Sequence, residues 1–206
     1  MRKDDKGLNP NPSYESLYGA PRKDGVTVRF LCLLALFLLF LALIVYYWNH
    51  TYARIVVSGS SMMETLYDGD VLIANTRVTA ERGDIIVVDV SDSDDEHFTG
   101  NFIIKRLIAL EGDSIYCKDN TVYLRVAGAA EYIALTEEYL SDTAETADFA
   151  PVTVGEGEIF AMGDNRANSY DSRRAGTFPQ EDIFGVVPDW AYAVKGITTS
   201  LNGFFG

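Results

Sequence analysis

The segment Phe30–Trp48 constrains the fold of this chain most, because it reads FLCLLALFLLFLALIVYYW and holds nineteen residues without a charge. As an α-helix it would span roughly 28 Å, which matches a bilayer core of about 30 Å. The run is longer than the apolar region of a typical cleavable signal peptide, and no A-x-A-like exit follows it. Its aromatic end, Tyr46-Tyr47-Trp48, suits a membrane–water interface. We predict a transmembrane helix over 26–48, with a buried core helix as the alternative.

Basic residues flank this segment unequally. Three precede it closely, namely Arg22, Lys23 and Arg29. Only Arg54 follows within six residues. Because basic residues favour the cytoplasmic side of a membrane, we expect residues 1–25 to form a short cytoplasmic tail. Residues 49–206 would then form an extracytoplasmic domain in a single-pass protein of the cell membrane, with lipid as one of its partners.

The charge balance argues against several classes of function. The formal net charge is -13, with acidic clusters at 92–96 and 137–148 that we interpret as solvated loops. Nucleic acid is an improbable partner, because its phosphates need basic side chains. Cys32 lies in the apolar run and Cys117 far beyond it, so we expect no disulfide between them. Composition leaves carboxylate sites for Ca²⁺ or Mg²⁺ open, but neither zinc-type nor EF-hand spacing occurs, and we predict no metal and no cofactor.

Short β-branched and aromatic runs recur after the apolar segment. The predicted strands are Arg54–Val57, Val71–Ala74, Asp84–Val90, Phe102–Leu110, Thr121–Val126, Ile159–Ala161 and Gly185–Val187. Gly-Asp pairs at 69–70, 83–84, 112–113 and 163–164 indicate tight turns between them. This pattern predicts a mostly β domain.

The stretch VSGSSMMETL at 57–66 raises the question of a serine nucleophile, which needs a base to take its proton. His50 and His97 lie in segments that do not look packed. Lys105, in NFIIKRLIAL, has apolar neighbours on both sides. Burial disfavours the ammonium form of lysine and lowers its pKa, so that a neutral amine can act as general base. The alternative is a lysine on the exposed side of a strand, with only its stem packed down.

Four motifs together resemble the bacterial type I signal peptidases, the membrane-bound Ser-Lys endopeptidases that remove signal peptides from exported preproteins. They are GSSMMETL, RGDIIVV at 82–88, IKRLIALEGD at 104–113 and GDNRANSYDSR at 163–173. The resemblance implies an open, barrel-like assembly of antiparallel strands, with Ser61 as the nucleophile and Lys105 as the general base. It also implies secretory preprotein substrates with small residues at the first and third positions before the cut.

The resemblance implies supporting roles for further residues. Ser169 would hydrogen-bond to the Lys105 amine, and two ion pairs, Arg106–Asp164 and Asp171–Arg173, would brace the site. The Ser61 amide can donate to the oxyanion. Some relatives have a serine where Gly59 stands, so Ser58 Oγ is a candidate second donor. We interpret Asn165 and Arg166 as a plain turn.

The chain departs from the family pattern at Glu64 and Glu111, where members usually have proline. Glutamate would loosen both turns, and its charge would favour protonated Lys105 if it lay close. Two other functions therefore stay open. One is a catalytically weak relative that acts as an assembly or chaperone factor for surface proteins, and the other is a membrane-anchored binding domain. Intact Ser61 and Lys105 argue against both.

Overall fold

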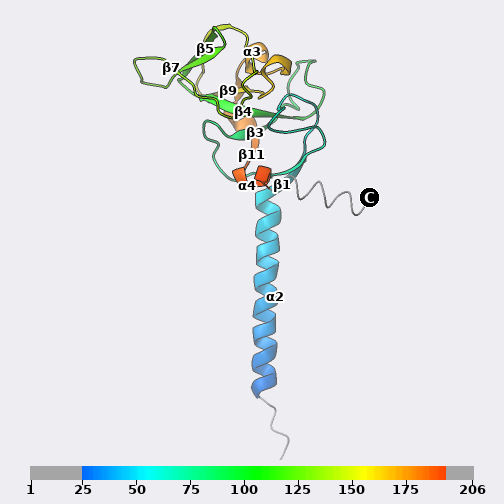
Figure 1. Cartoon of the computed structure of the whole chain (residues 1–206). Helices are drawn as coiled ribbons and strands as arrows, with labels where there is room; N and C mark the ends of the chain where they lie inside the picture. The colour runs from blue at the N-terminus through cyan, green and yellow to red at the C-terminus, as the bar shows by residue number, and fades with distance from the viewer. Residues whose placement is uncertain (1–24, 194–206) are drawn as a thin grey trace, which may run out of the picture. The chain divides into compact units, whose positions relative to one another are not determined.

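The computed structural model describes residues 25–193, and the predicted tail before Gly25 lies outside that range. Helix α2 runs from Gly25 to Thr51. By length and composition it is the one helix of the described residues that could cross a membrane. The chain divides into two compact units between Trp48 and Asn49, and the second unit carries all the strands (Figure 1).

Seven strands of the second unit form one long antiparallel sheet in the order β1-β2-β11-β3-β4-β9-β10. Their bounds are β1 Tyr52–Val56, β2 Val71–Asn75, β3 Ile85–Asp89, β4 Phe102–Leu110, β9 Glu158–Met162, β10 Phe178–Pro179 and β11 Ile183–Val187. Within the described residues the outermost strands, β1 and β10, do not pair with each other, so the sheet stays open. The predicted fold, a mostly β, open, barrel-like domain preceded in the chain by one apolar helix, is confirmed.

A second, smaller antiparallel sheet has the order β7-β6-β5-β8. Its strands are β5 Ser114–Lys118, β6 Thr121–Arg125, β7 Ile133–Ala134 and β8 Phe149–Thr153. Short helical segments complete the described chain: η1 Arg166–Asn168, α3 Ser172–Ala175, η2 Gln180–Asp182 and α4 Asp189–Ala193.

Strands β3 and β4 are covered on both faces, which explains why apolar residues follow one another in them rather than alternating with polar ones, apart from Lys105 and Arg106 in β4. Ile85 and Val87 of β3 pack in one cluster of the core, while Ile86 and Val88 pack in another. Two charged residues, Lys105 and Arg106, are buried in the middle of β4. Burying charge is costly unless partners compensate it, so these two residues indicate where a site lies.

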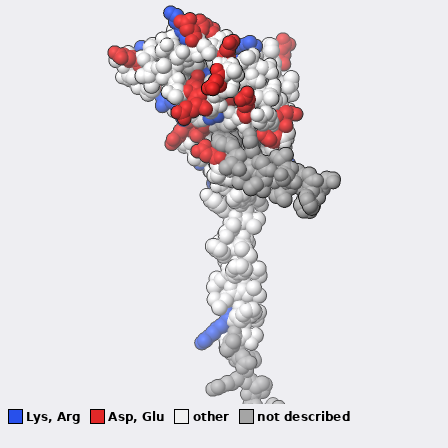
Figure 2. Space-filling model, viewed as in Figure 1, with Lys and Arg blue, Asp and Glu red and all other residues white. Residues whose placement is uncertain are grey.

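The strand predictions hold for all seven runs, with shifts of one or two residues at several ends. Sequence analysis missed β5, β7, β8 and β10. Figure 2 shows many acidic side chains on the visible face of the domain and an almost uncharged helix surface. One acidic residue does not fit the solvated-loop interpretation of 137–148. The Glu137 side chain is only 12% exposed because it pairs with Arg166.

Candidate active site

The site forms where the serine-bearing loop after β1 meets the centre of β4. Lys105 Nζ donates to Ser61 Oγ over 2.9 Å and to the Ile104 carbonyl over 3.1 Å. Lys105 is 4% exposed, whereas Ser61 is half-buried and therefore accessible from one side. The lysine is thus a buried group whose amine is hydrogen-bonded to the Ser61 hydroxyl, and the exposed-lysine alternative is wrong.

Burial is the main influence on the Lys105 amine, and it lowers the pKa of this group to about 8. The charges of Asp171 and Asp164 raise the pKa, and the charge of Arg173 lowers it. A lysine with a pKa near 8 is neutral in a substantial fraction of molecules at slightly alkaline pH. The amine can therefore accept a proton from the serine hydroxyl that it touches.

The 163–173 segment holds the serine loop in place through hydrogen bonds. The Asn165 amide donates to the Ser61 carbonyl over 3.0 Å, and Asn165 Nδ2 donates to the Ser60 carbonyl over 3.0 Å. Asn168 Nδ2 donates to Ser60 Oγ over 2.9 Å. The predicted turn exists as η1, but Asn165 is more than a plain turn residue, because it also holds the backbone of Ser60 and Ser61. No local pattern signals such a contact, because its partners lie about a hundred residues away.

Gly163 lies so close to the Ser61 backbone that there is no room for a side chain. A Cβ on this residue would lie 2.4 Å from the Ser61 carbonyl oxygen and 2.3 Å from Ser169 Oγ. Unlike Gly69, Gly83 and Gly112, Gly163 does not have a positive φ. The predicted turn role therefore explains the other glycines of the Gly-Asp pairs, whereas Gly163 is required for space.

Ser169 does not form the expected hydrogen bond with the Lys105 amine. Its Oγ is buried and has no hydrogen-bond partner among the described residues. The side chain packs against Gly163 and lies close enough to Asp171 to help lower the pKa of that carboxyl. The Lys105 amine instead donates to Ser61 Oγ and to the Ile104 carbonyl. The structure therefore does not contain the hydrogen bond expected between Ser169 and Lys105.

Both expected ion pairs are present. Arg106 binds Asp164 through two nitrogens, at 2.9 and 2.6 Å, and donates to the Gly83 carbonyl over 2.6 Å. Asp164 also accepts from Thr65 Oγ1, four residues after Ser61. The pair thereby connects the lysine strand to the serine loop.

The second ion pair joins Asp171 and Arg173 at the start of α3. Asp171 caps this short helix by accepting from the Arg173 amide, and it also accepts from the Gly163 amide over 2.9 Å. Burial tends to raise the pKa of Asp171, but the bonds and charge of Arg173 outweigh it and hold that pKa below its ordinary value. An ionised Asp171 thus stays near the lysine and moderates the effect of burial on its pKa.

The residues before Ser61 form a tight, exposed turn. Gly59 has a φ of 89°, a conformation that favours glycine, and its amide donates to Asp68. Ser58 is exposed. Met62 is buried in the core at 2% exposure, whereas Met63 faces outward at 38%.

The two unexpected glutamates have different surroundings. Glu111 accepts from the Gly157 amide over 2.9 Å and so stabilises a loop. Glu64 is exposed. Neither is among the charges that shift the pKa of Lys105, which come from buried residues of the 163–173 segment.

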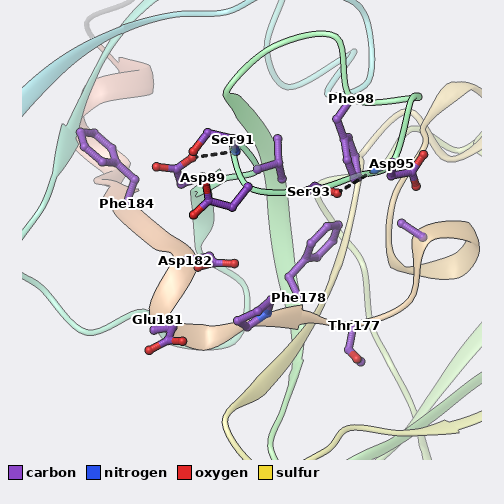
Figure 3. A pocket seen from close by; sticks show the side chains of 14 residues that line it. Asp89, Ser91, Ser93, Asp95, Phe98, Thr177, Phe178, Glu181, Asp182 and Phe184 are labelled. Carbon is purple, nitrogen blue, oxygen red and sulfur yellow. Dashed lines mark hydrogen bonds between the residues drawn. The ribbon is translucent and has the colours of Figure 1, made fainter.

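A cavity of about 570 Å³ lies at the other end of β3 and does not include the Ser61–Lys105 pair (Figure 3). Asp89 and Asp182 line it together with aromatic rings of Phe98 and Phe178. Asp89 lies opposite Phe102 on β4, three residues before Lys105, which is about 10 Å along a strand. Within the described residues no group of three or more His, Cys, Asp or Glu side chains could hold a metal ion.

A serine hydroxyl that is hydrogen-bonded to a buried lysine amine is the arrangement of the Ser-Lys hydrolases, in which the amine replaces the histidine of the usual triad. Comparison with known proteins identifies the family of the chain. The family model of the signal peptidases, peptidase S26, matches residues 29–190. The chain belongs to this family, and it is a serine peptidase of the signal peptidase I type, a hydrolase.

Individual relatives are similar over most of the domain. Signal peptidase I of Bacillus amyloliquefaciens is 38% identical over 138 residues, which cover 63% of this chain and 68% of the relative. Signal peptidase I T of Bacillus subtilis is 36% identical over 138 residues, with the same coverage. A crystal structure of a signal peptidase I from Enterococcus faecalis V583 is 30% identical, covers 54% of this chain and 98% of its own, and has a TM-score of 0.43.

Proposed function

We propose that this protein removes signal peptides from exported preproteins at the outer face of the membrane, with Ser61 as the nucleophile and Lys105 as the general base. The observation that carries the proposal is the 2.9 Å contact between Lys105 Nζ and Ser61 Oγ at an amine whose pKa is lowered by burial. Family membership supports the reaction, and this contact supports the mechanism.

In the first half of the reaction, Ser61 Oγ attacks the carbonyl carbon of the scissile peptide bond while the neutral Lys105 amine takes the hydroxyl proton. The tetrahedral intermediate carries its negative charge on the former carbonyl oxygen. When it collapses, the C–N bond breaks, and the Lys105 ammonium gives its proton to the leaving amine. The mature protein leaves with a new amino terminus, and the signal peptide stays attached to Ser61 as an ester.

In the second half, Lys105 takes a proton from a water molecule, and the resulting hydroxide attacks the ester carbonyl. Collapse of this intermediate breaks the bond to Ser61 Oγ, which regains its proton from the Lys105 ammonium. The signal peptide leaves with a free carboxylate, and both residues return to their starting state.

The oxyanion needs hydrogen-bond donors that point at the forming charge. The Ser61 amide is one candidate, since none of the hydrogen bonds found among the described residues uses it as a donor. Ser58 Oγ is the second candidate, because it lies on the exposed side of the turn.

An open sheet edge supports binding of an extended substrate beside Lys105. Strand β4 pairs with β3 from Phe102 to Arg106, but with β9 only from Arg106 onward. In the described part of the chain, no strand covers the other edge of residues 102–105. A peptide that adds to this edge gains backbone hydrogen bonds and brings its carbonyl close to Ser61.

The surroundings of the dyad fit small substrate side chains. Val57 and Met62 precede and follow the serine turn, and both lie in the apolar cluster against which Ile104 packs. Because this cluster is filled by the protein's own side chains, it offers apolar contact but little depth. Such a surface is suited to the small residues that we propose at the first and third positions before the cut.

Helix α2 and its flanking charges support the orientation. The basic residues Arg22, Lys23 and Arg29 precede most of the apolar run, and Arg54 follows it. We infer a cytoplasmic N-terminus and an extracytoplasmic domain over residues 49–206. The active site would then lie on the side where signal peptides emerge.

The test is cleavage of a purified preprotein by the full chain in liposomes, compared with Ser61→Ala, Lys105→Ala and the double variant His50→Ala/His97→Ala. Wild type and the histidine variant should cleave at similar rates, whereas the other two should be inactive but folded. Loss of activity in the histidine variant with its fold intact would refute the dyad. If wild type cleaves no preprotein but its deletion lowers the yield of surface proteins, the assembly-factor alternative holds instead.

A further inference from the structure

A segment between β7 and β8 is tied to the back of the site by one arginine. Arg166 is 3% exposed; it binds both carboxylate oxygens of Glu137 and donates to Thr146 Oγ1 over 3.0 Å. These contacts fasten residues 137–146 near both ends to η1 of the 163–173 motif. An arginine and a glutamate buried together form a bond that is hard to break, because either charge alone would be left unsolvated.

Tyr139 lies inside this fastened segment and is held at its hydroxyl. Tyr139 OH donates to Glu137 Oε1 over 2.7 Å and also accepts from Arg166 over 3.2 Å. Burial, reinforced by the charge of Glu137, raises the pKa of Tyr139 well above its ordinary value. The hydroxyl therefore keeps its proton near neutral pH, and its two hydrogen bonds hold the ring in position.

The Tyr139 ring covers the guanidinium of Arg106, whose Cζ lies 3.9 Å from the ring centroid. This contact leaves the in-plane N–H groups of Arg106 free for Asp164 and the Gly83 carbonyl. A stacked guanidinium keeps its planar fork aligned with a carboxylate, which a mobile one does not.

Arg106 connects the ring to both reacting groups. It follows Lys105 directly in β4, so its anchoring limits movement of the strand that carries the base. Its partner Asp164 accepts from Thr65 in the loop that carries Ser61. One contact from Tyr139 therefore acts on the base through the strand and on the nucleophile through Asp164.

We propose that Tyr139 is a positioning residue for the Ser61–Lys105 dyad, which acts by stacking on Arg106 and is itself held by Glu137 and Arg166. This inference rests on the proposed function, since it assigns a role within the same site. It also gives the 137–146 segment a role beyond that of a solvated acidic loop.

The charges around Lys105 determine in which direction its pKa would change if the Tyr139 ring were removed. The charged groups around Lys105 are Asp164, Asp171 and Arg173, together with Arg106, which neutralises Asp164. Without the ring, Arg106 no longer stays aligned with Asp164, and the carboxylate favours the ammonium form of Lys105 more strongly. The dyad would then lose geometry and neutral base together.

Three variants and one control test the proposal in the full chain. Tyr139→Leu removes the ring, Tyr139→Phe keeps the ring and removes the hydroxyl, and Glu137→Gln weakens the hold on Tyr139 at constant size. The control is Tyr132→Leu, because Tyr132 covers the guanidinium of Arg125 at 5.0 Å in the small sheet, away from the dyad. Measurements are kcat and KM for a preprotein in liposomes, and the Lys105 titration by NMR of [¹³Cε]lysine-labelled protein.

We expect Tyr139→Leu to lower kcat about tenfold, an effect between those of an exposed and a fully desolvated cation–π contact. KM should change little, and the Lys105 midpoint should move upward. Tyr139→Phe should keep most of the activity, Glu137→Gln should show a weaker effect of the same kind, and Tyr132→Leu should match wild type. If Tyr139→Leu does not fold, Glu137→Gln decides by the same two readouts.

Three results would overturn the proposal. Tyr139 also lines a cavity of about 350 Å³ with Met63, Glu64 and Asn165, so a rise in KM alone would mean that it contacts substrate. Equal losses in the Leu and Phe variants would mean that the ring is not what matters. An unchanged Lys105 midpoint with unchanged kcat would mean no positioning role. If wild type cleaves no preprotein, the proposed function fails, and the NMR titration still decides the role of Tyr139.

Discussion

Asn165 and Ser61 are joined by a backbone hydrogen bond of 3.0 Å from the amide of Asn165 to the carbonyl of Ser61. The bond shows that the loop carrying Ser61 is positioned by the 163–173 segment as well as by its own turn. Lys105 approaches from a different element, the centre of β4. The contact of the dyad thus depends on two separate sets of interactions, which can be tested one at a time.

Gly163→Ala should impair cleavage without touching either reacting group. The added Cβ would lie 2.4 Å from the Ser61 carbonyl oxygen, so the serine loop or Ser169 must move. We expect kcat/KM to fall by roughly ten- to a hundredfold, which corresponds to an overpacking cost of about 1–3 kcal/mol. Gly100→Ala is the matched control, because a Cβ there has no atom within 4 Å. Full activity in Gly163→Ala would show that the loop position is not critical.

The acid limb of the rate profile should move in opposite directions when opposite charges near the lysine are removed. Asp164 raises the pKa of Lys105 and Arg173 lowers it. Asp164→Asn should therefore shift the limb of kcat/KM to lower pH, and Arg173→Gln should shift it to higher pH. Peptide cleavage measured between pH 6 and 10 would check this. Shifts in the same direction would mean that structural damage, rather than charge, controls the variants.

Lys105→Met should stabilise the protein while it abolishes cleavage. The pKa of Lys105 is about 8 in the folded protein, compared with 10.5 ordinarily. The unfolded chain therefore binds more protons between these values, and the unfavourable contribution of this lysine is complete below pH 8 and disappears as pH rises to 10.5. At pH 7 the free energy of unfolding should increase on the order of 3 kcal/mol. Denaturant titration in micelles would check this, and a less stable variant would contradict the burial argument.

The topology can be tested by added protease. The cluster of Arg22, Lys23 and Arg29 before the apolar run, with Arg54 alone after it, predicts that residues 49–206 face outward. Protease applied to intact spheroplasts or protoplasts should digest the domain and spare an epitope tag at the N-terminus. Protection of the domain until the membrane is lysed would reverse the orientation.

Strands were predicted from the sequence alone where a run rich in β-branched, aromatic or other apolar residues corresponds to a single strand. Phe102–Leu110 was predicted with both ends correct, because its apolar residues continue on both sides of Lys105 and Arg106 and admit few alternatives. The missed strand β8 contains Pro151 and lies at the edge of the small sheet, where proline is tolerated but the strand pattern is weak. β5 reads SIYCK and contains a single β-branched residue, so its strand pattern is weak.

In the candidate site too, residues in local motifs were predicted, whereas residues that act through long-range contacts were not. The motifs predicted the Ser61–Lys105 pair and both ion pairs, because each residue lies in a recognisable local pattern, and the structure contains these contacts. The contacts of Tyr139 and Asn165 were not predicted, because their partners are distant in the chain. Glu64 and Glu111 were expected to matter through charge if they lay close to the lysine. The charges that shift its pKa instead belong to buried residues of the 163–173 segment, and Glu111 stabilises a loop.

The measurement that tests the central claim most directly compares two titrations of the wild-type full chain in liposomes or micelles. One is the acid limb of kcat/KM for preprotein cleavage, and the other is the NMR titration of Lys105, assigned by its loss in Lys105→Met. If neutral Lys105 is the general base, both should have the same midpoint, at about pH 8. An acid limb near pH 6.5, the ordinary value of histidine, together with a Lys105 that titrates at its ordinary pKa would contradict the account.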